Sequence, residues 1–304
     1  MKILLATQKP FSSVAVNQLK ELAQAKHELV IFEKYKEQSD LEEAVKDADA
    51  LIVRSDKVTA EVVNAATNLK IVVRAGAGYD NVDLQSCSER NIVVMNTPGQ
   101  NSNAVAELSL GLMIYLARNT FLPGTGSELK GKKLGIHAYG NVGKLVAGLA
   151  KGFGMEVSAF DPFVDDSVLI DDGVVPVKSV NELYSDNDVI SINIPAIPST
   201  IKSINKDILE NLKKSVILIN TARKEVIDEI DLLNAMRKNP GIKYGTDVMP
   251  DSHEKMKEFG MRYFATPKKM GAETEEANIN AAVAALNQII DFFETGNEKF
   301  RVNK

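Results

Sequence analysis

Residues 134–143, LGIHAYGNVG, decide the fold of this chain. A short apolar run ends at His137, and the turn that follows carries Gly140 and Gly143 before a helical pattern begins. In a dinucleotide-binding turn, the second glycine lets the backbone approach a pyrophosphate and the third lets helix and strand pack closely. The pyrophosphate binds at the positive end of the helix. The residues expected at a dinucleotide are Tyr139, Gly140, Asn141, Val142 and Gly143.

Ala138 occupies the position where this motif has its first glycine. If that residue needs a positive φ, its Cβ costs free energy and weakens dinucleotide binding. The next strand pattern ends in Asp161, about 20 residues further on, where a carboxylate binds the ribose hydroxyls and repels a 2′-phosphate. Pro162 and Phe163 follow it, not an arginine. The segment therefore predicts NAD, rather than NADP, as the cofactor.

Short β-branched runs alternate with helical patterns along the whole chain, which predicts parallel sheets with crossover helices. Six strands are expected in the part that holds the motif, as in a full dinucleotide-binding sheet: 133–137, 156–161, 188–194, 215–220, 242–248 and 262–266. Five more are expected before it: 2–7, 28–32, 50–54, 70–75 and 92–96. Helical patterns flank these strands, among them 12–26, 59–66, 103–118 and 273–295.

The predicted fold class is therefore α/β, with two doubly wound parallel-sheet domains. A turn-rich segment at 96–101 separates the two sets of strands, and the last helix is expected to return to the first set. We predict an NAD-binding Rossmann domain, residues 99–274. It is inserted into a flavodoxin-like substrate domain, residues 1–98 plus 275–304.

Composition excludes several classes of protein. Apolar residues make up 44% and charged residues 25% of the 304 residues, as in folded globular proteins. A net charge of −5 without a basic stripe argues against a nucleic-acid partner. No apolar run approaches the roughly 20 residues that span a bilayer, so no membrane is expected. The single Cys87 fits a reducing cytoplasm, and three scattered histidines predict no metal site.

Arg223 is a candidate for binding a substrate carboxylate. It closely follows the strand pattern at 215–220, and the carboxyl ends of strands in doubly wound sheets face the ligand. A guanidinium there can hold a carboxylate through two hydrogen bonds and polarise the neighbouring 2-oxygen. Taken alone, the segment is equally consistent with an ordinary surface arginine.

Seven ordered blocks resemble the D-2-hydroxyacid dehydrogenase family. They are 53–55 (VRS), 73–83 (VRAGAGYDNVD), 94–99 (VMNTPG), 106–108 (AEL), 220–223 (NTAR) with 228–229 (DE), 246–248 (TDV) and 265–267 (ATP). The resemblance implies an NAD-dependent oxidoreductase whose first domain and last helix bind substrate. It also implies cofactor contacts from Pro162, Pro195, Thr200, Thr221, Ala222, Asp247 and Gly271. Within the family, the branch that acts on 3-phospho-D-glycerate is the most similar.

The family normally uses an Arg–Glu–His set, of which only the arginine is present, as Arg223. Asp251 and Ser252 stand where the glutamate is expected, and a lysine replaces the histidine. Counting from Pro267 selects Lys268, whereas counting back from Gly271 selects Lys269; we predict Lys269, because the glycine fixes the start of the following helix. A lysine needs no carboxylate to raise its pKa, and Arg223, the nicotinamide charge and desolvation would all lower it.

Two alternatives to this mechanism stay open. Both lysines can be solvated surface charges of an inactive protein, or His253 can be the base. Lys224, where the family usually has glycine, has no explanation from the sequence.

The first domain offers cations for a substrate phosphate: Arg54, Lys57 and Arg74 each lie at or just after a strand end. The backbone N–H groups of Gly76, Ala77 and Gly78 can hold a carboxylate, and the resemblance adds Ser55. Each cation taken singly can be an ordinary exposed base, and for Lys57 alone this interpretation is favoured.

The predicted reaction is oxidation of 3-phospho-D-glycerate. The alternatives are a hydroxypyruvate or glyoxylate reductase and a non-enzymatic NAD-binding regulator of the same fold. We also predict a homodimer through the apolar helix 103–118, and no inhibition by serine, because no regulatory domain follows residue 304.

Overall fold

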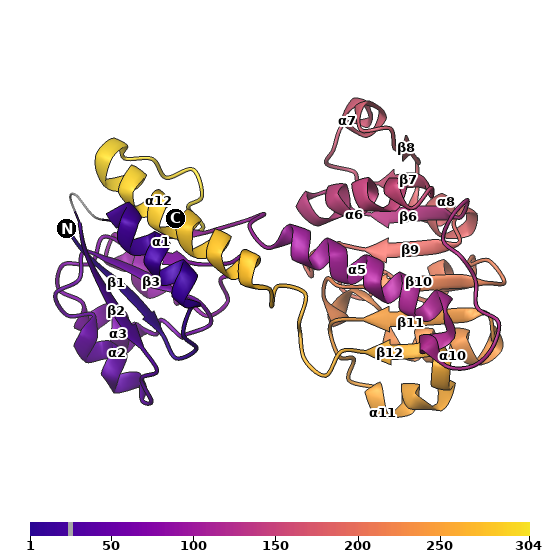
Figure 1. Ribbon diagram of the computed structural model, residues 1–304, viewed down its shortest axis with the longest axis horizontal. Helices are drawn as coiled ribbons and strands as arrows, with labels where there is room; N and C mark the ends of the chain where they lie inside the picture. Colours follow the sequence, from indigo (N-terminus) through magenta and orange to yellow (C-terminus); the bar gives the residue numbers. More distant parts are fainter. Residues whose placement is uncertain (24–26) are drawn as a thin grey trace. The chain divides into compact units, whose positions relative to one another are not determined.

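The computed structural model describes residues 1–23 and 27–304, and divides the chain into two compact units. Unit 1 comprises Met1–Asn101 with Glu273–Lys304, and unit 2 comprises Ser102–Ala272. These limits differ by a few residues from the domain limits expected from the sequence. Each unit has its own sheet (Figure 1). Each unit also has its own hydrophobic core.

Unit 1 holds a five-stranded parallel sheet in the order β2-β1-β3-β4-β5, the flavodoxin-like arrangement. The strands are β1 (Lys2–Thr7), β2 (Glu28–Glu33), β3 (Ala50–Val53), β4 (Ile71–Arg74) and β5 (Val93–Asn96). The helices are α1 (Ser13–Ala23), α2 (Gln38–Ala44), α3 (Ala60–Ala65), α4 (Leu84–Glu89) and α12 (Glu275–Thr295). The helix expected at 12–26 includes residues 24–26, which lie outside the described residues.

Alternate residues of each strand in unit 1 face opposite layers of helices. Ile3 and Leu5 of β1 pack with α1 and α12, whereas Leu4 and Ala6 pack with the layer formed by α2, α3 and α4. The last helix therefore completes one face of this sheet beside α1 (Figure 1). Gly296 ends it in the left-handed conformation, with a φ of 75°.

Unit 2 holds a seven-stranded parallel sheet in the order β12-β11-β10-β9-β6-β7-β8. The strands are β6 (Lys133–His137), β7 (Glu156–Phe160), β8 (Val175–Pro176), β9 (Val189–Ile192), β10 (Val216–Asn220), β11 (Ile242–Thr246) and β12 (Tyr263–Ala265). The α-helices are α5 (Ser102–Ala117), α6 (Asn141–Gly152), α7 (Asp166–Asp171), α8 (Val180–Asp186), α9 (Lys206–Leu209), α10 (Glu229–Lys238) and α11 (His253–Met256). Order and direction are those of a Rossmann sheet, with β12 added at one edge.

The short strand β8 was not expected from the sequence. Two paired residues, Val175 and Pro176, are too few to give a periodic pattern, and their register with Ser158 and Ala159 comes from the sheet itself. Every strand predicted from the sequence is present. The two doubly wound sheets confirm the predicted fold class.

Helix α5, the apolar helix expected at a dimer interface, packs mainly inside unit 2. Leu110, Leu112, Met113 and Leu116 are buried against α6 and the sheet. The apolar composition of this helix is therefore explained largely by the core of its own unit, and does not by itself require a partner subunit. No helix in the described ranges has both the length and the apolar content needed to cross a membrane.

Candidate active site

The dinucleotide turn of unit 2 has the conformation that the motif requires. Ala138 has a φ of 78°, the left-handed region that favours glycine, so the strain expected from its Cβ is present. Its N–H donates to the carbonyl oxygen of Phe160 at 2.9 Å and ties the turn to β7. A Cβ at Gly143 would lie 2.3 Å from the carbonyl oxygen of Ala138, so α6 can start here only with glycine at that position.

The start of α6 fits a pyrophosphate. Gly140 is the N-cap and supplies no side-chain acceptor for the first N–H groups of the helix. A Cβ built at Gly140 would meet no atom within 4 Å, so this residue borders open space. Backbone donors at the positive end of a helix are a common binding site for phosphate groups. Gly140, Asn141 and Val142 are therefore placed to hold one.

Asp161 lies beside this turn, where a ribose ligand is expected. Its Oδ2 accepts a hydrogen bond from the N–H of Tyr139 at 2.8 Å, and its Oδ1 accepts one from the N–H of Phe163 at 2.9 Å. The phenol of Tyr139 is buried and donates to Asp172 at 3.0 Å. Any contact of Tyr139 with a cofactor is therefore through its main chain.

Pro195 and Thr200, also expected at the cofactor, form one loop after β9. The hydroxyl of Thr200 donates to the Pro195 carbonyl oxygen at 2.5 Å and accepts from the N–H of Ile197 at 2.9 Å. These two bonds give the loop a fixed shape.

Asn220, the last residue of β10, shapes the turn that carries Arg223. Its Oδ1 accepts from the N–H of Ala222 at 3.0 Å, and its Nδ2 donates to the carbonyl oxygen of Arg223 at 2.9 Å. Thr221 is nearly buried, with its hydroxyl 3.1 Å from that of Ser109. The Arg223 side chain is exposed, so this turn presents a guanidinium at the carboxyl end of the sheet.

Asp247 holds the loop between β12 and α12. Its carboxylate is fully buried and accepts hydrogen bonds from the Thr266 hydroxyl at 2.9 Å and from the N–H groups of Met270 and Gly271, each at 2.7 Å. A Cβ at Gly271 would lie 2.8 Å from Oδ2 of Asp247. Asp247, expected at the cofactor, is therefore first of all a support for this loop.

The two candidate lysines lie on the loop that Asp247 holds. Lys268 and Lys269 are both exposed. The Thr266 hydroxyl, which donates to Asp247, lies 2.7 Å from the carbonyl oxygen of Lys268. Hydrogen bonds of Asp247 to Thr266 on one side and to Met270 and Gly271 on the other thus hold the backbone that carries both lysines. That Lys269, and not Lys268, transfers the proton stays a prediction.

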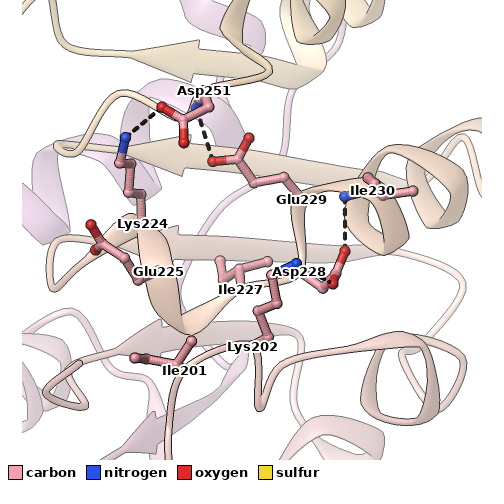
Figure 2. Close-up of a pocket in the computed structure, with 9 residues that line it drawn as sticks. All are labelled: Ile201, Lys202, Lys224, Glu225, Ile227, Asp228, Glu229, Ile230 and Asp251. Atoms are coloured by element: carbon pink, nitrogen blue, oxygen red, sulfur yellow. Dashed lines mark hydrogen bonds and ion pairs between the residues drawn. The ribbon is translucent and has the colours of Figure 1, made fainter. Parts of the chain in front are cut away.

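Figure 2 shows an ion pair between Lys224 and Asp251, the latter at the position where the glutamate was expected. Glu229 accepts hydrogen bonds from the backbone N–H groups of Asp251 at 2.9 Å and Ser252 at 2.7 Å. Asp251 holds the pKa of Lys224 above its usual value, mainly through their hydrogen bond. Lys224 therefore stays protonated near neutrality and binds the carboxylate of Asp251.

This ion pair borders a cavity of about 270 Å³ in unit 2. Its lining consists of apolar, basic and acidic side chains: Ile201, Lys202, Lys224, Glu225, Ile227, Asp228, Glu229, Ile230 and Asp251 (Figure 2). Lys202 also forms an ion pair, with Asp228 at 3.3 Å.

In unit 1, Arg54 and Arg74 lie side by side at the carboxyl ends of β3 and β4. Nε of Arg74 donates to the carbonyl oxygen of Arg54 at 2.8 Å, and Asn81 donates to the same oxygen at 3.4 Å. A Cβ at Gly76 would lie 1.7 Å from the Arg74 guanidinium, so that guanidinium rests directly on the glycine backbone. Ser55 and Lys57 are exposed in the loop that follows Arg54.

The expected backbone site at Gly76–Gly78 is only partly available. The N–H of Gly76 donates to the carbonyl oxygen of Arg74 at 2.9 Å. The side chain of Asn96 donates to the Ala77 carbonyl oxygen at 2.6 Å and fixes the turn. Ala77 and Gly78 are therefore the remaining backbone donors to consider for an anion.

Two of the three histidines have structural surroundings. His137 is buried, with Nδ1 3.2 Å from the Tyr184 hydroxyl, and burial lowers its pKa to about 4. Nδ1 of His253 lies 2.8 Å from the Tyr263 hydroxyl. Within residues 1–23 and 27–304, no group of three or more His, Cys, Asp or Glu side chains is arranged to hold a metal ion.

Comparison with known proteins gives one family. The sequence model described as D-isomer specific 2-hydroxyacid dehydrogenase, catalytic domain, matches residues 5–303. A hydroxypyruvate reductase of Thermotoga maritima is 34% identical over 289 residues, which cover 88% of this chain and 92% of the relative. A D-3-phosphoglycerate dehydrogenase of Methanocaldococcus jannaschii is 36% identical over 268 residues, 82% of this chain and 51% of the relative.

The chain spans about half the length of the curated phosphoglycerate dehydrogenases it matches. Among solved structures, NAD+-bound 3-phosphoglycerate dehydrogenase of Entamoeba histolytica is similar with a TM-score of 0.87 and 48% identity. That match covers 100% of this chain and 99% of the other.

Proposed function

Because the chain belongs to the D-isomer specific 2-hydroxyacid dehydrogenase family, we propose that it oxidises 3-phospho-D-glycerate to 3-phosphohydroxypyruvate with NAD. The observation that carries this choice of substrate is the pair Arg54 and Arg74, two guanidinium groups at adjacent strand ends in unit 1. An unphosphorylated 2-hydroxy acid has one anionic group, for which Arg223 in unit 2 is already available. Two further arginines suit a second anionic group, and phosphate is the one that arginine binds most readily.

NAD supplies the hydride acceptor in this reaction. The uncapped start of α6 and the carboxylate of Asp161 bind and orient the dinucleotide. Asp161 also disfavours NADP, because a 2′-phosphate would meet a negative charge.

Arg223 holds the substrate carboxylate and its 2-oxygen, and Lys269 accepts the proton of the 2-hydroxyl group. Lys224 is excluded from that role, because its ion pair with Asp251 raises its pKa. A base must lose its proton near neutral pH, so it needs a lowered pKa.

A substrate screen that follows NADH absorbance tests the proposal. 3-Phospho-D-glycerate is offered with NAD, and 3-phosphohydroxypyruvate, hydroxypyruvate and glyoxylate are offered with NADH. We expect the phosphorylated pair to give the highest kcat/KM. Higher kcat/KM with hydroxypyruvate or glyoxylate would assign the chain to the reductases, such as the similar protein of Thermotoga maritima. No turnover of any compound, with NADH still bound, would favour a non-enzymatic NAD-binding protein.

A further inference from the structure

The side chain of Arg54 contacts two residues that the sequence analysis did not single out. Its guanidinium carbon lies 5.0 Å from the ring centroid of Phe11. Its Nη2 donates a hydrogen bond to Oδ1 of Asn278, in the first turn of α12. Phe11 follows β1 and Asn278 lies far along the chain, so the guanidinium is held by two separate elements of unit 1.

Phe11 is itself firmly placed. It is buried at 6% exposure in the core that α1 and α12 share with the sheet. Its N–H donates to Glu33 at 2.9 Å, and the N–H of Gln8 in the same loop donates to Asp56 at 2.6 Å. The phenyl ring therefore offers a fixed surface for a guanidinium, a favourable cation–π arrangement.

The two contacts leave the charge of Arg54 intact. Phe11 and Asn278 are neutral, so neither cancels the positive charge that an anion needs. Glu33 and Asp56, the two carboxylates that hold this loop, accept hydrogen bonds from the backbone N–H groups of Phe11 and Gln8. A charged acceptor at position 278 would hold the guanidinium equally well but would compete with an anionic ligand.

The position of Arg54 also affects Arg74. Nε of Arg74 donates to the carbonyl oxygen of Arg54 at 2.8 Å, so both guanidinium groups depend on the same short segment after β3. An arginine that is already ordered loses less side-chain entropy when it binds a phosphate.

We propose that Phe11 and Asn278 are positioning residues that orient Arg54 to bind the phosphate group of the substrate. This inference rests on the proposed function and adds the residues that determine its specificity. Phe11 and Asn278 act through Arg54. Substitution of either should therefore lower the preference for a phosphorylated substrate and leave the rates of hydride and proton transfer unchanged.

The test compares 3-phosphohydroxypyruvate with hydroxypyruvate in Phe11→Leu and Asn278→Ala. Each variant should raise the KM for the phosphorylated substrate about fivefold, the size expected when one cation–π contact or one hydrogen bond is lost. The KM for hydroxypyruvate and both kcat values should change less than twofold. Phe11→Tyr keeps an aromatic face and should behave as the unmodified protein, whereas Asn278→Asp should raise the KM further by cancelling charge.

Two control variants separate positioning from general loss of packing. Phe32→Leu alters a half-buried phenylalanine that stacks on Tyr35 in the same unit, and Asn280→Ala alters an exposed asparagine of α12. Both should leave the substrate preference unchanged. In an Arg54→Ala background, Phe11→Leu and Asn278→Ala should have no further effect on KM. The inference is overturned if Phe11→Leu and Asn278→Ala raise KM equally with and without Arg54. It is also overturned if they raise the KM of both substrates equally.

A binding measurement keeps this inference distinct from the proposed function. Inorganic phosphate should raise the unfolding midpoint of the unmodified protein, and raise it less in Phe11→Leu. If the unmodified protein does not prefer the phosphorylated substrate, the proposed function fails. If it does, but Phe11→Leu keeps that preference and its response to phosphate, the positioning role of Phe11 is wrong.

Discussion

At the residue scale, we propose that one of two neighbouring exposed lysines on the loop before α12, Lys268 or Lys269, transfers the proton. We predict that Lys269→Met lowers kcat about 10²–10⁴-fold, the usual cost of a lost general base, while Lys268→Met has a small effect. Binding of NADH, followed by its fluorescence, should be retained in both variants and shows that they are folded.

The opposite pattern, with Lys268→Met inactive and Lys269→Met nearly normal, would assign the role to Lys268. If neither substitution matters and His253→Ala abolishes turnover, the lysine mechanism is wrong. The hydrogen bond of His253 to Tyr263 gives it a structural role that makes this outcome unexpected.

We propose that Asp161 sets the choice of cofactor. We expect Asp161→Ala to weaken NADH binding about tenfold or more, the range for hydrogen bonds to a charged group. Asp161→Asn keeps an acceptor but not the negative charge, so it should bind NADPH better while retaining much of its NADH affinity. NADPH affinity equal to that for NADH in the unmodified protein would contradict this role.

At the scale of elements, the loop between β12 and α12 depends on one buried carboxylate. In Asp247→Asn an amide NH2 group would face backbone N–H donors, because one of the two acceptor oxygens is lost. We predict that this variant loses about 1–3 kcal/mol of stability and at least tenfold in kcat. Thr266→Val removes only one hydrogen-bond donor to Asp247, so it should lower stability and kcat less than Asp247→Asn does. Unchanged kcat in a folded Asp247→Asn variant would show that the loop does not need this support.

The sequence predicted the strands because their apolar runs are continuous, as buried parallel strands require. It did not predict β8, because two residues of an edge strand carry no periodicity. Asp161 and the glycines of the dinucleotide turn could be proposed from the sequence because the required spacing is local. The contacts of Asp247 with the loop before α12, and of Arg54 with Phe11 and Asn278, join residues distant in the sequence, so only the fold reveals them.

The contact of Lys224 is another that joins residues distant in the sequence. From the sequence it was an unexplained substitution for glycine, and Asp251 was an incomplete match to a glutamate. The structure pairs the two, so both departures belong to one ion pair.

At the scale of the whole molecule, we predict a homodimer through unit 2. Leu108, Ile114 and Tyr115 of α5 remain partly exposed, and Phe121 and Leu122 just beyond it are 68% and 54% exposed. A second copy that covers these side chains would remove apolar surface from water. Light scattering at micromolar concentration should give the mass of a dimer, and Phe121→Ser with Leu122→Ser should shift it towards a monomer. A monomeric mass for the unmodified protein would refute the dimer.

Each unit contributes a different part of the proposed reaction. Unit 1 supplies the two arginines for a phosphate, and unit 2 supplies the dinucleotide turn, Arg223 and the lysine-bearing loop. The central claim is that the cations of unit 1 make this chain an enzyme for a phosphorylated substrate.

The most direct test of that claim is the ratio of kcat/KM for 3-phosphohydroxypyruvate to kcat/KM for hydroxypyruvate, measured with NADH in the unmodified protein and in Arg74→Ala. We predict a ratio well above one in the unmodified protein and a fall of at least tenfold in the variant, because a charge-assisted hydrogen bond to the phosphate is lost. A ratio near one in the unmodified protein, or a ratio that Arg74→Ala leaves unchanged, would contradict the account.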